Sequence, residues 1–161
     1  MKRLSVVVVS IAVCLSATHD AQANERPDEE QIRQVVHDQE MAWNRGNAKD
    51  YAAHFQEEGA FTNVVGVTYE TRDVFEARVA QIFATIFNGS KLSNTVRKIR
   101  FVRPDVAIVS ITTEISGLKG LPPGVKASAD GKLRTNKLEV LVKENGQWSV
   151  AAFHNLDMKV E

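Results

Sequence analysis

The sequence predicts an α+β domain in which helices cover one face of a strongly curved, antiparallel sheet. Apolar residues recur at helical spacing in the first half of the chain, beyond residue 24. Strand-like segments rich in β-branched residues fill the second half, and Lys132–Met158 is predicted to be a hairpin. Helices followed by a run of strands are typical of α+β domains. A strongly bent sheet under helices forms a cone, and its mouth is a natural ligand cavity.

Residues 1–23 are predicted to be a secretory signal peptide. Lys2 and Arg3 precede a mostly apolar stretch, and Ala21-Gln22-Ala23 provides the small residues of a cleavage site. The apolar stretch is too short for a membrane span. The mature domain, residues 24–161, is therefore expected in the periplasm or outside the cell, with no membrane attachment after cleavage.

Composition excludes several classes of function. The only cysteine, Cys14, falls in the predicted signal peptide, so the mature domain has no disulfide and no thiol chemistry. The 20 basic and 20 acidic residues balance, and without a basic tract a nucleic-acid partner is not expected. Neither metal-binding histidine spacings nor glycine-rich nucleotide loops occur, so the sequence predicts no metal and no cofactor.

Three helices and one short strand are predicted in the first half of the domain. The first helix begins at Asp28 as N-cap and ends at Gly46. A short helix over 48–55 and a strand over 59–65 follow, and a third helix over 72–88 begins after Thr71 as its cap.

The second half is predicted to be almost entirely strand. Strands over 95–102 and 106–116 are joined by a turn with Pro104 at its second position. Residues 117–134 are expected to form a mobile loop. The final hairpin turns at Asn145-Gly146, a pair suited to the type I′ geometry of tight hairpins.

Two segments carry a resemblance to a known group: Ala42-Trp43-Asn44-Arg45-Gly46 and Trp148–Asn155. With the order of the elements, they resemble the SnoaL-like group of nuclear transport factor 2-like proteins, and within it the SgcJ/EcaC family. The resemblance covers the whole mature domain. It implies a cone-shaped fold, a pocket between sheet and helices, and commonly a homodimer packed through the sheet. Relatives include isomerases, cyclases, dehydratases, epoxide hydrolases and non-catalytic association domains, so the fold does not fix a function.

Ketosteroid isomerase chemistry, found in this group, requires a carboxylate base with a Tyr and a protonated Asp as donors. Counting along this chain places Asn63, Gln39 and Leu138 at the corresponding positions. None of the three can take the required role, so that reaction is not expected. Glu139, one residue on, is expected to point to the opposite face of its strand from Leu138.

Six residues are predicted to line the cavity and contact a ligand. Gln39 and Trp43 share one face of the first helix, although Trp43 alone is better interpreted as a core residue. Asn63 either contacts a ligand or stabilises a turn. Strand alternation and the resemblance place Phe153 and Asn155 on the pocket face. The set is Gln39, Trp43, Asn63, Tyr69, Phe153 and Asn155.

The candidates for acid–base chemistry are weak. The same alternation places His154 with Trp148 and Val150 on the outer face, where an interface role is favoured over catalysis. A bulge in the strand would reverse this assignment. His54, at the end of the short helix, is exposed or reaches the cavity, and Asp50 is expected to cap that helix.

The sequence leaves two functions open. The first is the binding of a small, largely apolar molecule in the cone. The second is a cofactor-independent isomerase, cyclase or lyase acting on a small carbonyl or polycyclic compound. Binding is favoured because neither a carboxylate nor a His–carboxylate pair is predicted to face the cavity. A third interpretation is a dimeric structural module whose cone is filled by its own side chains.

Overall fold

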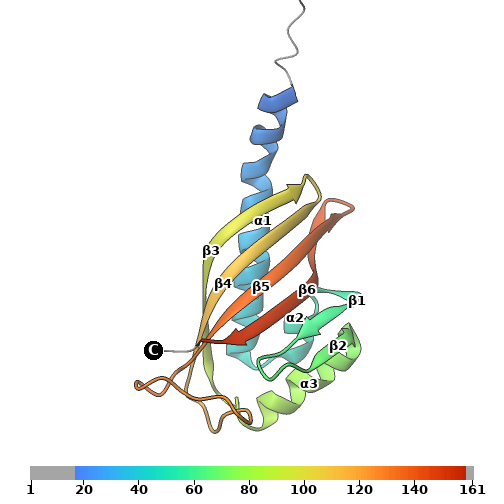
Figure 1. Ribbon diagram of the computed structural model, residues 1–161. Helices are drawn as coiled ribbons and strands as arrows, with labels where there is room; N and C mark the ends of the chain where they lie inside the picture. Colours follow the sequence, from blue (N-terminus) through green and yellow to red (C-terminus); the bar gives the residue numbers. More distant parts are fainter. Residues whose placement is uncertain (1–16, 159–161) are drawn as a thin grey trace, which may run out of the picture.

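The computed structural model describes the backbone of residues 17–158 and the side chains of residues 27–158. Residues 1–16 of the predicted signal peptide lie outside this range. Within it the chain forms three helices and six strands (Figure 1): α1 (Ala17–Arg45), α2 (Ala48–Ala52), β1 (Phe55–Thr62), β2 (Thr68–Thr71), α3 (Arg72–Ala84), β3 (Lys91–Arg103), β4 (Val106–Ser116), β5 (Leu133–Glu144) and β6 (Gln147–Asp157). None of the described helices is both long and apolar enough to cross a membrane.

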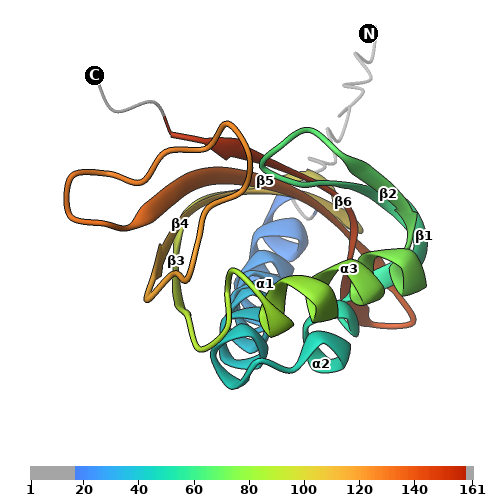
Figure 2. The same cartoon turned by 90° about the horizontal axis from the view of Figure 1, so that it is seen from below.

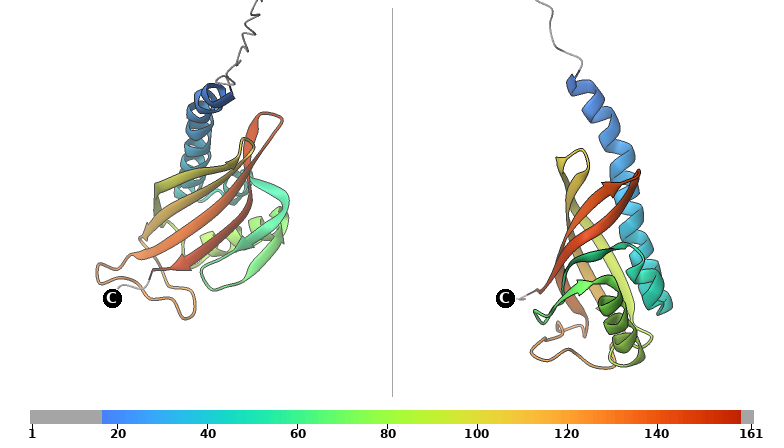
Figure 3. Two further views of the ribbon diagram at one scale, coloured as in Figure 1. Left: turned by 45° about the horizontal axis from the view of Figure 1, so that its top comes forward. Right: turned by 90° about the vertical axis from the view of Figure 1, so that its right-hand side faces the viewer.

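The six strands form one sheet in the order β2-β1-β6-β5-β4-β3. All neighbouring strands are antiparallel except β1 and β6, which run parallel. The sheet arches over the helices (Figure 2), and α1 runs along its concave side (Figure 3). The predicted α+β architecture, with a curved sheet packed by helices, is confirmed.

The predicted hairpin is formed by β5 and β6. Asn145 and Gly146 both have positive φ, 51° and 79°, as a type I′ turn requires. The turn places Glu144 opposite Gln147 and fixes the register from there.

A bulge in β6 interrupts this register. Leu141 pairs with Val150 but Val140 pairs with Ala152, so Ala151 is an extra residue. The extra residue reverses the alternation of side chains along the strand.

Because of the bulge, residues on both sides of Ala151 face the helices. Trp148 and Val150 are buried before it, and Phe153 is buried after it. The expectation that Trp148 and Val150 lie on the outer face is therefore wrong. His154 is exposed on the outer face, as expected.

Gly59 allows β1 to approach this bulge closely. A Cβ atom at Gly59 would lie 2.5 Å from the carbonyl oxygen of Ala151 and 2.5 Å from the ring of Phe61. Only glycine leaves room for both contacts, so residue 59 and the bulge fit together.

Asp28 does not cap α1, because the helix continues through it. Its carboxylate Oδ1 accepts hydrogen bonds from Lys143 Nζ at 2.6 Å and from Trp148 Nε1 at 3.1 Å. Asp28 is 7% exposed, so these bonds lie in the interior and fasten α1 to the turn end of the β5–β6 hairpin.

Several element boundaries differ from the prediction. The second helix ends at Ala52, and Phe55, predicted to be helical, begins β1. The third helix ends at Ala84, four residues early, and Thr71 occupies its N-cap position without a side-chain bond. Strand β2 was not predicted.

Candidate functional site

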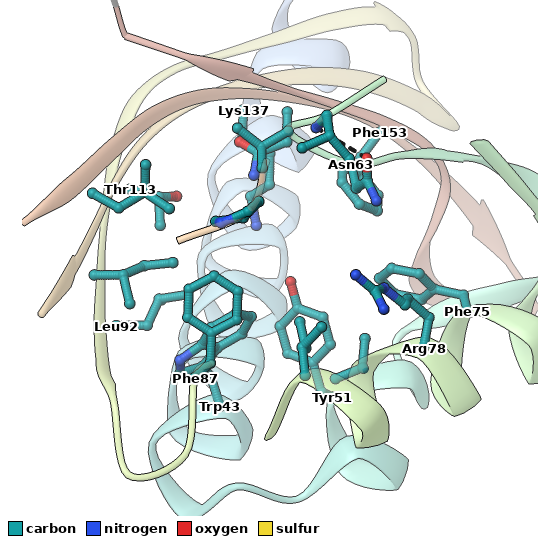
Figure 4. A pocket seen from close by; sticks show the side chains of 18 of the residues that line it. Trp43, Tyr51, Asn63, Phe75, Arg78, Phe87, Leu92, Thr113, Lys137 and Phe153 are labelled. Carbon is teal, nitrogen blue, oxygen red and sulfur yellow. Dashed lines mark hydrogen bonds between the residues drawn. The ribbon is translucent and has the colours of Figure 1, made fainter. Parts of the chain in front are cut away.

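A cavity lies between the concave face of the sheet and the three helices (Figure 4). Its volume is about 90 Å³. A cavity needs at least about 10–15 Å³ to hold one water, so this one has room for several waters or a small organic molecule. Aromatic and aliphatic side chains form most of its lining.

Trp43 forms one wall of the cavity and is held in place from several sides. Its ring packs edge-on against Phe83, Phe87 and Tyr51, with centroid distances of 4.9, 5.3 and 5.7 Å. Its Nε1 donates a hydrogen bond to Ser90 Oγ at 3.1 Å. Trp43 is thus both a core residue and a rigid cavity wall.

A second aromatic cluster closes the β1 side. Phe75 of α3 packs against Phe55, Phe61 and Phe153 at centroid distances of 4.8, 5.4 and 5.5 Å. Phe75 and Phe153 also line the cavity, so this wall has a fixed shape.

Asn63 combines the two roles that the sequence left open. Its Oδ1 accepts hydrogen bonds from the backbone N–H groups of Val65 and Val67, which stabilise the turn after β1. Its Nδ2 donates to the hydroxyl of Tyr69 at 3.3 Å. Asn63 and Tyr69 both border the cavity.

Lys137 and Glu139, both in β5, form a buried ion pair on the sheet side of the cavity. Lys137 is 6% exposed and lines the cavity, and Glu139 is fully buried beside it. Lys137 Nζ lies 2.9 Å from Glu139 Oε1 and donates a hydrogen bond to Gln39 Oε1 at 3.2 Å. Neither carboxylate oxygen of Glu139 has a well-oriented hydrogen bond within the described chain.

The inward direction of Glu139 follows from the unbroken alternation of β5, in which Leu133 and Leu141 are buried on the same face. Counting evenly from the Asn145-Gly146 turn would pair Phe153 with Leu138, but the extra residue pairs it with Glu139. Directly opposed residues share a face of the sheet. Leu138 is accordingly 44% exposed on the outer face. Glu139 therefore faces the concave side of the sheet beside Lys137, although it does not itself line the cavity.

Lys137 and Tyr51 are two proton donors at the cavity, and their pKa values depend on burial and neighbouring charges. Burial lowers the pKa of Lys137, but the opposite charge of Glu139 and the proximity of Tyr51 outweigh it, and the pKa is raised. Burial raises the pKa of Tyr51, against the influence of Lys137. The ammonium and the phenol are therefore both protonated at neutral pH. The Tyr51 hydroxyl points into the cavity.

Arg78 brings a second cation to the cavity from α3. Its guanidinium points towards the middle of the cavity in Figure 4. Nη1 donates to Gln81 Oε1 at 2.6 Å, a neutral acceptor that leaves the charge uncompensated. Among the described residues no carboxylate forms an ion pair with Arg78, and none lines the cavity.

All the predicted ligand-binding residues except Gln39 line the cavity: Trp43, Asn63, Tyr69, Phe153 and Asn155. Gln39 lies behind Lys137 and is fully buried. Asn155 Oδ1 is buried and has no hydrogen-bond partner within the described chain.

The three acid–base candidates do not line the cavity. Asp50 does not cap α2: Asn47 is the cap and accepts a hydrogen bond from the Asp50 N–H, while the Asp50 side chain is exposed and faces Arg45 at 3.4 Å. His54 is half-buried, and burial lowers its pKa against the opposing charges of Asp38, Glu139 and Asp50. Sequence reasoning did not select Lys137, Glu139, Tyr51 or Arg78 as site residues. For Lys137 and Glu139 the only local signal was the i, i+2 spacing of two charges in a strand-like run.

Neither a protein-family model nor a curated protein matches this chain. Solved structures do. A cystatin-like domain of unknown function from Nostoc punctiforme is 27% identical, with a TM-score of 0.70 over 83% of this chain and 79% of that one. An NTF-2-like protein of unknown function from Shewanella oneidensis is 19% identical, with a TM-score of 0.66 over 81% and 99%. The hexachlorocyclohexane dehydrochlorinase LinA is 10% identical, with a TM-score of 0.70 over 86% and 90%. The chain has the cystatin-like, nuclear transport factor 2-like fold.

Proposed function

We propose that this protein binds a small, largely apolar molecule in the cone cavity. The observation that carries the proposal is the cavity itself, whose rigid aromatic walls surround a few convergent polar groups. Pockets of that composition are the usual sites of small ligands. The resemblance to the SnoaL-like group and its SgcJ/EcaC family also implies a pocket between sheet and helices. With residues 1–23 as signal peptide, the protein acts in the periplasm or outside the cell.

Native mass spectrometry of the purified protein tests this proposal. We expect a fraction of the wild type to carry the mass of a co-purified small molecule. Ile82→Trp, which extends an indole into the cavity from its half-buried lining, is expected to lose that mass. Val74→Trp is the matched control, because Val74 is 56% exposed on the same helix. An empty wild type that also binds no member of a small-molecule library would contradict the proposal.

A cofactor-independent isomerase, cyclase or lyase is the second candidate. It is favoured by the protonated Tyr51 and Lys137 at the cavity and by Glu139 behind them, whose oxygens lack hydrogen bonds. Buried donors of this kind can polarise a carbonyl as negative charge develops. LinA, a dehydrochlorinase, has the same fold. Once a ligand is identified, Tyr51→Phe distinguishes the two: an enzyme loses turnover while binding is retained, whereas a binding protein turns over nothing in either form.

We also propose that two copies associate through the outer face of the sheet. The outer apolar patch consists of Ile108, Leu138, Val140 and Leu156, of which Leu138 and Leu156 are 44% and 64% exposed. Apolar side chains grouped on an exposed sheet face are typical of interaction surfaces. The resemblance, in which homodimers form through the sheet, supports a second copy of the chain as the partner.

A further inference from the structure

The polar atoms that face the cavity are mostly hydrogen-bond donors. Lys137 carries three protons, one of which is donated to Gln39 Oε1, and Glu139 lies 2.9 Å away as its ion-pair partner. Tyr51 makes no hydrogen bond to the described residues through its hydroxyl. The Tyr69 hydroxyl accepts from Asn63, so its own proton is available. The cavity therefore offers several donors to a ligand.

Acceptors are scarce on the same surface. The Thr113 hydroxyl donates its proton to Asn94 Oδ1 at 2.7 Å, which leaves only the weak acceptor capacity of its oxygen. Asn155 Oδ1 is a buried acceptor without a partner in the described chain. A ligand that satisfies this lining has more acceptors than donors.

The charges around the cavity also favour a ligand with acceptor groups. Glu139 compensates the charge of Lys137, and the guanidinium of Arg78 has no carboxylate partner among the described residues. One positive charge without a carboxylate partner among the described residues thus faces the cavity, from a half-buried side chain. It suits a monoanion, since a dianion would leave a negative charge in a largely apolar enclosure.

We infer that the ligand is a small organic carboxylate with an apolar body about the size of one ring. Its carboxylate is held by Arg78, whose planar guanidinium matches that group in a two-bond geometry. The donors of Tyr51 and Lys137 face the remaining acceptor positions, and the body lies against the walls formed by Trp43 and Phe75. This inference rests on the proposed binding function and narrows its ligand class.

Calorimetric titration of the full purified chain with three pairs of probes tests the inference. Each pair is a carboxylate and its neutral amide: benzoate and benzamide, phenylacetate and phenylacetamide, cyclohexanecarboxylate and its amide. We expect at least one carboxylate to bind about tenfold or more tighter than its amide, because 1.4 kcal/mol of charge-assisted binding corresponds to a factor of ten.

The variant Arg78→Gln identifies the group responsible. It is expected to weaken binding of the preferred carboxylate about tenfold and to change binding of the matching amide by less than about twofold. Arg97→Gln is the matched control, because Arg97 is exposed on β3 and does not line the cavity. Circular dichroism confirms that both variants are folded.

The outcomes separate this inference from the proposed function. If every amide that binds does so as tightly as its carboxylate, or if Arg78→Gln leaves the affinity for the preferred carboxylate unchanged, the carboxylate inference is wrong and small-molecule binding stands. If no carboxylate binds while other neutral compounds do, the inference is again wrong. If nothing binds and native mass spectrometry finds an empty protein, both are wrong.

Discussion

Lys137 and Glu139 are the residues whose burial has the largest physical consequence. Removing two charges from water costs several kcal/mol per ion, and their attraction offsets this only with good geometry and further hydrogen bonds. Here the carboxylate oxygens of Glu139 lack such bonds in the described chain. Stability alone therefore does not account for the pair, which agrees with a role at the cavity.

Replacing one member of this pair should destabilise the protein more than replacing both. Lys137→Met is expected to lower the free energy of unfolding by about 3–5 kcal/mol, because it leaves the Glu139 carboxylate buried without its partner. The double variant Lys137→Met, Glu139→Leu should recover most of that loss. Urea unfolding at pH 7 measures all three proteins. A single variant as stable as the wild type would show that Glu139 is not held as a buried charge.

His54 gives the stability a pH dependence of known sign. Burial holds its pKa below the ordinary value of 6.5. Below pH 6.5 the unfolded chain therefore binds a proton that the folded chain does not, and the contribution of His54 is lost as the pH falls through the folded pKa.

His54→Gln should consequently flatten the pH profile. Between pH 7 and pH 5 the free energy of unfolding is expected to fall less in the variant than in the wild type, as measured by urea unfolding at each pH. His154→Gln, on the exposed outer face, is the control and should follow the wild type. Parallel profiles for wild type and His54→Gln would contradict the assignment.

Among the elements, β1 and β6 depend on one local fit, in which Gly59 faces the Ala151 bulge. Gly59→Ala would place a methyl group 2.5 Å from a backbone carbonyl and from the Phe61 ring. Overpacking of this kind costs about 1–3 kcal/mol. Thermal and urea unfolding should show that loss. Gly120→Ala is the control, because its new methyl meets only the side chain of Ile86, at 3.2 Å. Equal effects in the two variants would contradict a specific role for Gly59.

Sequence patterns predict an element well where one strong local signal sets it. The end of α1 at Arg45-Gly46, strand β4 and the Asn145-Gly146 turn all agree with prediction. Strand β2 has four residues with mostly exposed side chains and no alternation to detect. The spacing of Phe55 from Tyr51 predicts a helix that contains both. Phe55 instead begins β1, and its ring still packs against that of Tyr51.

Part of the cavity lining could also be predicted, where a regular strand pattern applies. Residues such as Phe153 and Asn155 were placed correctly because they follow the bulge, so that alternation counted back from the end of β6 applies to them. Lys137 and Glu139 could not, because even counting from the turn pairs Phe153 with Leu138, and only the extra residue in β6 brings Phe153 opposite Glu139. A bulge of this kind depends on packing with β1, which lies far away in the sequence.

At the scale of the whole molecule, one curved sheet presents two surfaces with different tasks. The sheet curves over the helices (Figure 2). Its concave face closes the cavity against them, and its outer face carries the outer apolar patch. We expect Leu156→Lys to produce a monomer, because it places a charge in the patch. Light scattering after size-exclusion chromatography measures the mass, with Val74→Lys on α3 as control. A monomeric wild type would contradict association through this face.

The claim on which the account depends is that a small molecule enters the cone. The two tryptophans of the chain report on it separately. Trp43 lines the cavity and bonds to Ser90, whereas Trp148 lies outside the lining and bonds to Asp28. Their indole N–H signals in a ¹⁵N-correlated NMR spectrum are assigned with Trp148→Phe, and the wild type is titrated with the tightest of the carboxylate probes. We predict a saturable shift of the Trp43 signal while that of Trp148 stays in place. A ligand that binds but shifts Trp148 and leaves Trp43 unchanged would contradict the account.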